Sequence, residues 1–274
     1  RLAPLALLTV AIGWGASFVL MKDSIKTQPI TDFLGTRFII ATVAIILIRP
    51  SVLRLIRGQL LRYGVILGVL LGGGYWTQTT GLSMTTAAIT GFITGLYVIF
   101  TPVLAWALHK QKLKRKVLFG ALLAVASLAF IAFNGVSTEV GQIWVIACAL
   151  LFAAHIVYLS RWSPGQDPYA LTVVQLGTMA VFFSLVAIID GYQAPVGFSG
   201  WFTIVFTALV GTSLAFLVQT WAQSIMEASR TAIYLTSETV WTAFIAVAVG
   251  QEVLGWRTIV GGILMVAAMV TVEW

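Results

Sequence analysis

Charged side chains are scarce in this sequence. Asp, Glu, Lys and Arg make up only 9% of its 274 residues, whereas soluble domains average about 25%. Apolar residues reach 59%, and the mean hydropathy is +0.99. This composition excludes a soluble globular domain and predicts an integral membrane protein built from helices.

Cysteine and histidine are also rare. The single cysteine, Cys148, lies in an apolar run, which excludes an internal disulfide and a multi-cysteine metal site and predicts a small buried side chain. His109 and His155 form neither a cluster nor an HExxH motif. We therefore expect no metal and no cofactor. The sequence also lacks the clustered Asp, His or Cys that a membrane-embedded transferase would need, so such an enzyme is only a distant alternative.

The net charge of +7 comes from cations in short segments between apolar runs. Binding to nucleic acid requires cations gathered on one exposed face or stripe. We therefore expect no nucleic-acid partner and take the lipid bilayer and a small solute as the partners of this chain.

Ten apolar segments are long enough to approach the roughly 20 residues that a transmembrane helix needs. They are residues 4–21, 30–48, 63–81, 87–108, 117–133, 142–160, 168–189, 200–221, 231–250 and 257–273. The connections between them are short, so we expect no soluble domain among them.

The basic residues set the expected orientation. Five cations fall between Lys110 and Lys116, directly after an uncharged span. With the N-terminus inside, twelve of the sixteen Lys and Arg residues face the cytoplasm, three face outward, and Arg37 lies within a span. Because Lys and Arg are concentrated in cytoplasmic loops, both termini are predicted to be cytoplasmic, in the inner (plasma) membrane.

A weak internal repeat suggests the architecture. With a shift of 142 residues, Met84–Phe130 aligns without a gap on Met226–Val272, with seven identities in 47 positions. Residues 1–134 and 135–274 are then two five-helix repeats. Because five is odd, the repeats cross the membrane in opposite senses, as in many secondary transporters whose substrate site lies where the repeats meet.

Three ionisable residues lie inside predicted spans. Glu238 is near the middle of its span and should face a cavity or a partner, either as a proton-sensitive group or ammonium contact or as a structural anchor. Arg37 is expected to snorkel or pair between helices, or to bind a substrate carboxylate. His155 is either a packing residue or a titrating group in a cavity.

Aromatic residues near span centres lie too deep for the interfacial belt. Together with a few polar residues they predict an aromatic-walled substrate cavity, although each alone also fits lipid contact or packing. The predicted substrate-binding set is Trp14, Tyr75, Trp76, Gln78, Tyr97, His155, Tyr158, Tyr234, Glu238 and Trp241.

Proline and glycine add two further expectations. Pro102 removes a backbone hydrogen bond within its span, which predicts either a gate hinge or a static bend. The GxxxG pairs Gly68–Gly72 and Gly91–Gly95 allow close helix approach. We expect that approach within a monomer, with a dimer as the alternative.

Several segments resemble the EamA-type members of the drug/metabolite transporter superfamily. They are GWGASFVLMK (residues 13–22), Arg37, the run GLSMTTAAITGFITGLYVIFTPVLAW (residues 81–106) and the closing GxxL pattern at Gly120 and Gly262. The chain looks most similar to YddG-type inner-membrane exporters of aromatic and other neutral amino acids. The second half departs from the pattern, with Ala153-Ala154 in place of the WG of the first span.

The resemblance implies a secondary exporter of small organic solutes, amino acids including aromatic ones, that works by alternating access. It implies no enzyme activity. The sequence contains no nucleotide-binding motif, so a gradient must supply any energy, and proton coupling and facilitated transport both stay open. A cationic drug or a sugar-type metabolite is the alternative cargo on the same fold.

Overall fold

The computed structural model of the chain describes residues 2–84, 87–110, 112, 114–132, 140–250 and 255–273. Every regular element within these residues is a helix, in agreement with the prediction of an all-α protein. The helices of residues 1–134 are α1 (Leu2–Ser24), α2 (Ile30–Ile48), η1 (Pro50–Leu55), α3 (Gly58–Met84), α4 (Ala87–Gly95), α5 (Tyr97–His109) and α6 (Arg115–Ala132). Those of residues 135–274 are α7 (Val140–Trp162), α8 (Pro168–Asp190), α9 (Gly197–Ala208), the π-helical η2 (Leu209–Leu214), α10 (Ala215–Gln223), α11 (Ala228–Thr236), α12 (Glu238–Ala248) and α13 (Trp256–Glu273).

Six helical segments of the described chain are long and apolar enough to cross a membrane. They are Leu2–Met21, Ile30–Ile48, Val140–Trp162, Pro168–Asp190, Gly197–Gln223 and Ala228–Ala248. Two shorter apolar helices cover Ile93–His109 and Ile259–Val272, and α3 and α6 cover the predicted third and fifth spans. Six spans are therefore supported by length and composition, and the count of ten stays a prediction.

The outside of the helical bundle is apolar. Large hydrophobic side chains such as Leu47, Ile189 and Phe198 are 72%, 81% and 86% exposed. A soluble monomer rarely leaves so much apolar surface uncovered. These exposed apolar side chains are therefore consistent with a surface that faces lipid.

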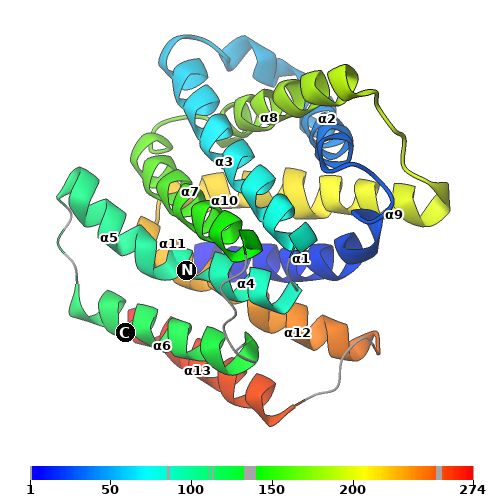
Figure 1. Ribbon diagram of the computed structural model, residues 1–274. Coiled ribbons are helices and arrows are strands. Elements are labelled where there is room, and N and C mark those ends of the chain that lie inside the picture. The colour runs from blue at the N-terminus through cyan, green and yellow to red at the C-terminus, as the bar shows by residue number, and fades with distance from the viewer. Residues whose placement is uncertain are drawn as a thin grey trace.

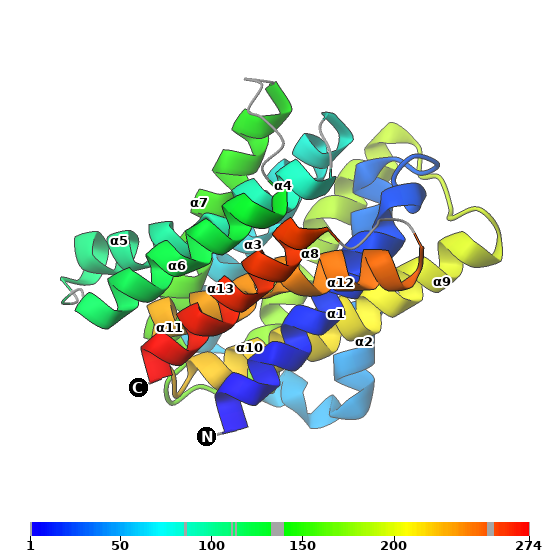
Figure 2. The same ribbon diagram turned by 90° about the horizontal axis from the view of Figure 1, so that it is seen from below.

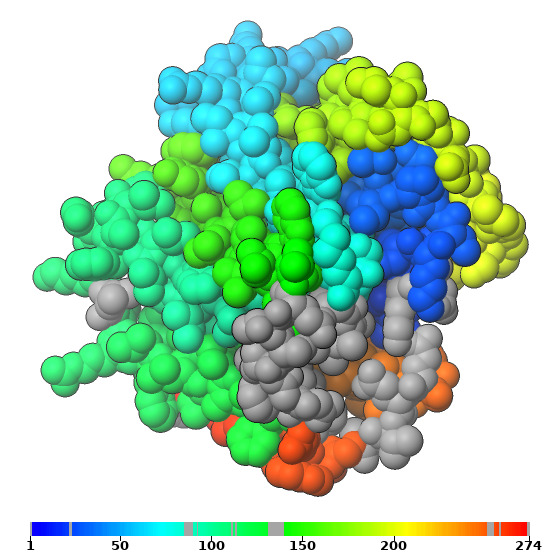
Figure 3. Space-filling model, viewed as in Figure 1, coloured from blue at the N-terminus to red at the C-terminus, as the bar shows by residue number. Residues whose placement is uncertain are grey.

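The helices pack in a pattern that joins the two halves of the chain. Helix α3 of the first half packs against α7 and α8 of the second half, and α2 packs against α8. On the other side of the bundle, α1 packs against α9, α10 and α12, while α6 pairs with α13 along its length (Figures 1 and 2). The space-filling view shows side chains of α3 and α7 meeting directly on one face (Figure 3).

Glycines on α3 permit its close approach to two neighbours. A Cβ added at Gly68 would lie 2.7 Å from the Cβ of Thr178 in α8, and one added at Gly81 would lie 2.8 Å from the carbonyl oxygen of Gly141 in α7. Real Cβ atoms do not tolerate such distances, so these positions require glycine. The Gly68–Gly72 pair is thus used for packing inside the chain.

Two spans are interrupted in the same way. The first break separates α4 from α5 at Leu96 (φ −61°, ψ −11°), and the second separates α11 from α12 at Ser237 (φ −61°, ψ −12°). At both breaks the backbone N–H donates to a carbonyl three residues earlier, Leu96 to Ile93 (3.1 Å) and Ser237 to Tyr234 (3.2 Å). Each break is therefore a single tight 3₁₀-type turn inside a membrane-length helix.

Pro102 lies inside α5, and the helix continues through it. The interruption of this span falls at Leu96 instead. Pro102 is buried and lines a small hollow beside Lys114 and Glu227, which form an ion pair (2.6 Å). A role of Pro102 as a gate stays a prediction.

The N-terminal end of α1, the C-terminal end of α13 and the segment between α5 and α6 lie on the same side of the molecule in both ribbon views (Figures 1 and 2).

The side chain of Asp167 caps the start of α8, accepting from Ala170 N (3.0 Å), and pairs with Arg49 (2.8 Å). This contact ties the end of α2 to the start of α8.

Candidate functional site

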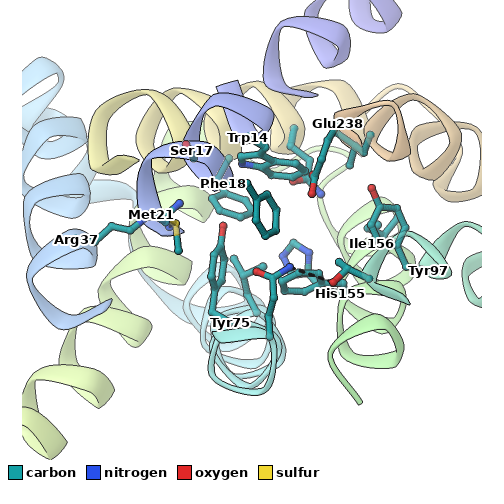
Figure 4. A pocket seen from close by; sticks show the side chains of 17 residues that line it. Trp14, Ser17, Phe18, Met21, Arg37, Tyr75, Tyr97, His155, Ile156 and Glu238 are labelled. Atoms are coloured by element: carbon teal, nitrogen blue, oxygen red, sulfur yellow. Dashed lines mark hydrogen bonds between the residues drawn. The ribbon is translucent and has the colours of Figure 1, made fainter. Parts of the chain in front are cut away.

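A cavity lies between the two halves of the bundle, next to both helix breaks. It contains about 600 Å³ of space free of atoms, part of it continuous with the outside. The residues that line it are Trp14, Ser17, Phe18, Met21, Arg37, Leu71, Tyr75, Gln78, Thr94, Tyr97, Phe152, His155, Ile156, Phe216, Gln219, Leu235 and Glu238 (Figure 4).

Aromatic rings form much of the cavity wall. The Trp14 ring lies 5.6 Å from that of Phe216, and Tyr75 contacts Phe152 and Phe216 edge to face at 5.6 and 6.2 Å. Trp14 Nε1 donates to the carbonyl oxygen of Gly211 (2.9 Å), which fixes the indole. These contacts hold a rigid apolar surface at the centre of the protein.

Arg37 is buried at one side of the cavity, at 1% exposure. Its Nε donates to Thr212 Oγ1 (2.7 Å), Nη2 to the carbonyl oxygen of Gly211 (3.2 Å) and Nη1 to Met21 Sδ (3.2 Å). The guanidinium carbon also lies 5.2 Å from the Tyr75 ring centroid. Within the described residues no carboxylate forms an ion pair with it, so Arg37 is a fixed buried cation held by neutral partners.

Glu238 is the first residue of α12 and lies directly after the break at Ser237. It is 8% exposed and lines the cavity. No Lys, Arg or His of the described chain forms an ion pair with its carboxylate. The cavity thus holds one cation and one acidic group that are not paired with each other.

Two further polar atoms in the cavity are buried without a hydrogen-bond partner among the described residues, Tyr97 Oη and Gln219 Oε1. The Gln219 amide is oriented by its neighbour, because its Nε2 donates to Gln223 Oε1 (2.8 Å), while Gln223 Nε2 donates to Ile156 O (2.7 Å) and Ser160 Oγ (2.6 Å). The Gln219 oxygen is therefore left as a free acceptor.

His155 and Gln78 have partners inside the protein. His155 Nε2 and Gln175 Oε1 lie 2.8 Å apart, and Gln175 Nε2 donates to Leu171 O (3.2 Å). Gln78 Nε2 donates to Thr94 Oγ1 (3.3 Å) across to α4. Both residues line the cavity, but part of their hydrogen-bonding capacity is already used.

Six of the ten residues predicted to bind substrate converge on this cavity: Trp14, Tyr75, Gln78, Tyr97, His155 and Glu238. The other four lie elsewhere. Trp76 is 45% exposed on the outside of α3, and Tyr158 stacks on Trp162 with ring centroids 4.7 Å apart. Tyr234 is buried in a hydrophobic cluster, and Trp241 packs edge to face on Phe244.

The prediction missed several lining residues. Gln219 carried the same signal as Glu238, because a polar side chain inside an apolar span needs a partner or a cavity. Phe152, Phe216 and Met21 carried no such signal, since apolar residues are expected throughout every span.

The fold and site together define a multi-pass helical membrane protein with an internal cavity lined by aromatic and polar residues. A model of the EamA-like transporter family matches residues 1–133 and again 139–274, so the chain belongs to this family of membrane transporters. The family identifies it as a transporter.

Two relatives from Archaeoglobus fulgidus are similar over nearly the whole chain. One is 29% identical over 99% of this chain and 85% of its own length, and the other is 24% identical over 93% of this chain and 92% of its own. Both are described as uncharacterized transporters. A solved crystal structure with 17% identity superposes with a TM-score of 0.83 over 98% of this chain and 96% of its own, which supports the fold alone.

Proposed function

We propose that this protein is an inner-membrane secondary exporter of small organic solutes, amino acids including aromatic ones, that works by alternating access between two inverted five-helix repeats. The observation that carries the proposal is the cavity itself. It lies between the two halves of the chain, much of its wall is aromatic, and two of its lining residues, Tyr97 and Gln219, each have a buried polar atom without a hydrogen-bond partner among the described residues. Such a site can bury an apolar side chain while holding polar groups in fixed positions.

Three observations support the inverted repeat. The family model matches each half separately. Contacts between the halves come in corresponding pairs: α3 packs on α7 as α10 packs on α1, and α5 packs on α7 as α12 packs on α1. The breaks at Leu96 and Ser237 fall at nearly equivalent positions of the repeat and have nearly equal backbone angles.

The proposed orientation has both termini in the cytoplasm. It is supported by the common side of the chain ends and of the segment that carries Lys110, Lys112 and Lys114. Cations in that segment would remain on the cytoplasmic side. We also propose that the monomer is the working unit, because Gly68 is already used for packing against α8.

An amino-acid substrate suits a cavity that offers both a cation and an acid. Arg37 fits a carboxylate or Glu238 fits an ammonium group, and the aromatic rings fit the remainder of the solute. A cationic drug, the alternative cargo, would use Glu238 and the aromatic wall but leave Arg37 without an anion. A sugar-type cargo would use neither charge.

A solute panel in proteoliposomes containing only the purified chain tests this proposal. We expect counterflow of labelled tryptophan that is competed by neutral amino acids more strongly than by a quaternary ammonium drug or a hexose. The reverse order of competition would assign the alternative cargo. Modification of a lipid without flux of any solute would instead indicate an enzyme.

A further inference from the structure

The two charges of the cavity enter from opposite sides. In the close-up view, Arg37 reaches in beside Met21, Glu238 reaches in from the other side, and Trp14 and Phe18 lie between them (Figure 4). Neither charged group has a counter-ion within the described residues. Their separation therefore decides which solute can contact both.

Contacts with α1 give the scale of that separation. The helices α1 and α12 run in the same direction and touch where a Cβ on Gly15 would lie 2.8 Å from Thr242 N (Figure 2). Glu238 is one turn before Thr242, whereas Arg37 bonds to Met21, which is six residues after Gly15. Four residues on one side of this contact and six on the other place the two backbone positions about 15 Å apart at a rise of about 1.5 Å per residue, and both side chains reach into the cavity between them.

The Arg37 side of the cavity can receive an anion. A guanidinium carries five N–H donors, and three are used, one of them on a thioether sulfur that accepts only weakly. Tyr75 lies against the same guanidinium, and the N–H groups that the protein does not use suit the oxygens of a carboxylate. Asp32, the nearest acidic residue in the sequence, instead accepts from Gln193 N (2.8 Å).

The Glu238 side can receive a cation. Arg37 donates to the carbonyl oxygen of Gly211, and Gln219 lies eight residues after Gly211 in the chain. The Oε1 atom of Gln219 is buried without a hydrogen-bond partner among the described residues. Because α10 runs opposite to α1, this displacement carries Gln219 from the Arg37 side toward the Glu238 side (Figure 1). A carboxylate and an amide oxygen together accept hydrogen bonds from an ammonium group.

We propose that the cavity selects an elongated zwitterion, a solute whose carboxylate and ammonium groups sit at opposite ends of an apolar body. The carboxylate binds Arg37, the ammonium binds Glu238 and Gln219, and the body lies against Trp14 and Tyr75. An α-amino acid carries both charges on one carbon and can contact only one end with them. This inference rests on the proposed transport function and specifies the solute that its site prefers.

Calorimetric titration of the purified chain in detergent tests the preference. The probes are glycine, γ-aminobutyrate and ε-aminocaproate, which differ in the distance between their charges, and hexanoate and hexylamine, which each keep one charge. We expect ε-aminocaproate to bind at least about tenfold more tightly than glycine, hexanoate or hexylamine. Equal affinity for glycine and ε-aminocaproate, or no binding by any member of the series, would overturn the proposal.

Two variants test which residue holds which charge. The substitution Glu238→Gln should lower the affinity for ε-aminocaproate to that for hexanoate and should change the affinity for hexanoate by no more than about twofold. The substitution Arg37→Gln should lower the affinity for ε-aminocaproate to that for hexylamine. Retained binding of the one-charge probe shows that each variant still folds. The exposed Glu227→Gln and Arg54→Gln are matched controls that should leave the preference intact. A preference for ε-aminocaproate that survives both cavity substitutions contradicts the assignment.

The calorimetric and flux experiments distinguish a failure of the elongated-zwitterion proposal from a failure of the proposed transport function. A length preference in calorimetry without flux of any solute in proteoliposomes would retain the binding site and reject the proposed transport function. Flux of other solutes without binding of the zwitterion series would reject only the elongated zwitterion.

Discussion

The substitution Tyr97→Phe should stabilise the protein and impair its function at the same time. The Tyr97 side chain is 3% exposed and lines the cavity, and its hydroxyl has no hydrogen-bond partner among the described residues. A buried polar group without a partner costs about 1–3 kcal/mol of stability. Phenylalanine keeps the ring and its packing but removes that cost.

The expected gain is therefore at least about 1 kcal/mol, which for a protein of this size corresponds to a rise in Tm of about 2–4 °C. Thermal unfolding in detergent without added solute measures it. The matched control is Tyr63→Phe, because the Tyr63 hydroxyl is exposed and accepts from Gln59 Nε2 (2.5 Å), so its removal should not stabilise the protein.

The same variant should raise the KM for the transported solute in proteoliposomes by about three- to tenfold, since a neutral hydrogen bond contributes about 0.5–1.5 kcal/mol. A Tm equal to or below that of the unmodified chain, together with an unchanged KM, would refute the reasoning. It would mean that the hydroxyl is already satisfied inside the protein and faces no solute.

Three further predictions concern packing and surface contacts. Gly68→Ala should destabilise the protein by about 1–3 kcal/mol, because the new Cβ would meet α8. Gly91→Ala should not, because a Cβ there would lie in open space, and thermal unfolding of the two variants measures the difference. Gln223→Leu should lower Tm by several degrees, because it leaves the buried hydrogen-bond partners on α7 and α10 unpaired. Lys114→Ala breaks an exposed ion pair with Glu227 and should change stability by less than about 1 kcal/mol, with no change in flux.

Sequence reasoning located the intramembrane polar residues well because their physical requirement is strict. A polar side chain in a membrane span must face a partner or a cavity, and Glu238, Gln78 and Tyr97 all line the cavity. The same requirement applied to Gln219. The predicted binding set does not include Arg37, for which the sequence allows either pairing between helices or contact with a substrate carboxylate, although Arg37 too lines the cavity.

The direction in which each aromatic residue points could not be predicted. Tyr75 and Trp76 are neighbours on α3, and successive residues of a helix point about 100° apart. Tyr75 faces the cavity, whereas Trp76 contacts Phe182 at the outer surface of the bundle. Because the spans are apolar on every side, the sequence does not show which face of a helix points toward the cavity and which toward the outer surface.

The helix breaks were also beyond the sequence. Pro102 removes a backbone donor within its span, but α5 runs through Pro102, and the interruption of the span lies at Leu96, for which the sequence carries no comparable signal. Ser237 breaks the corresponding span without a proline nearby.

The breaks explain how a cavity with opposite charges arises from two similar backbones. Each break starts a new half-helix at the cavity, α5 at Tyr97 and α12 at Glu238. The partial positive charge at the start of α12 stabilises a carboxylate there, so Glu238 can stay buried without a cation. The first half has a phenol at nearly the same position, and its buried charge, Arg37, lies on a different helix. The two breaks thus have nearly equal backbone angles, whereas the two halves of the chain contribute different charges to the cavity, Arg37 from the first half and Glu238 from the second.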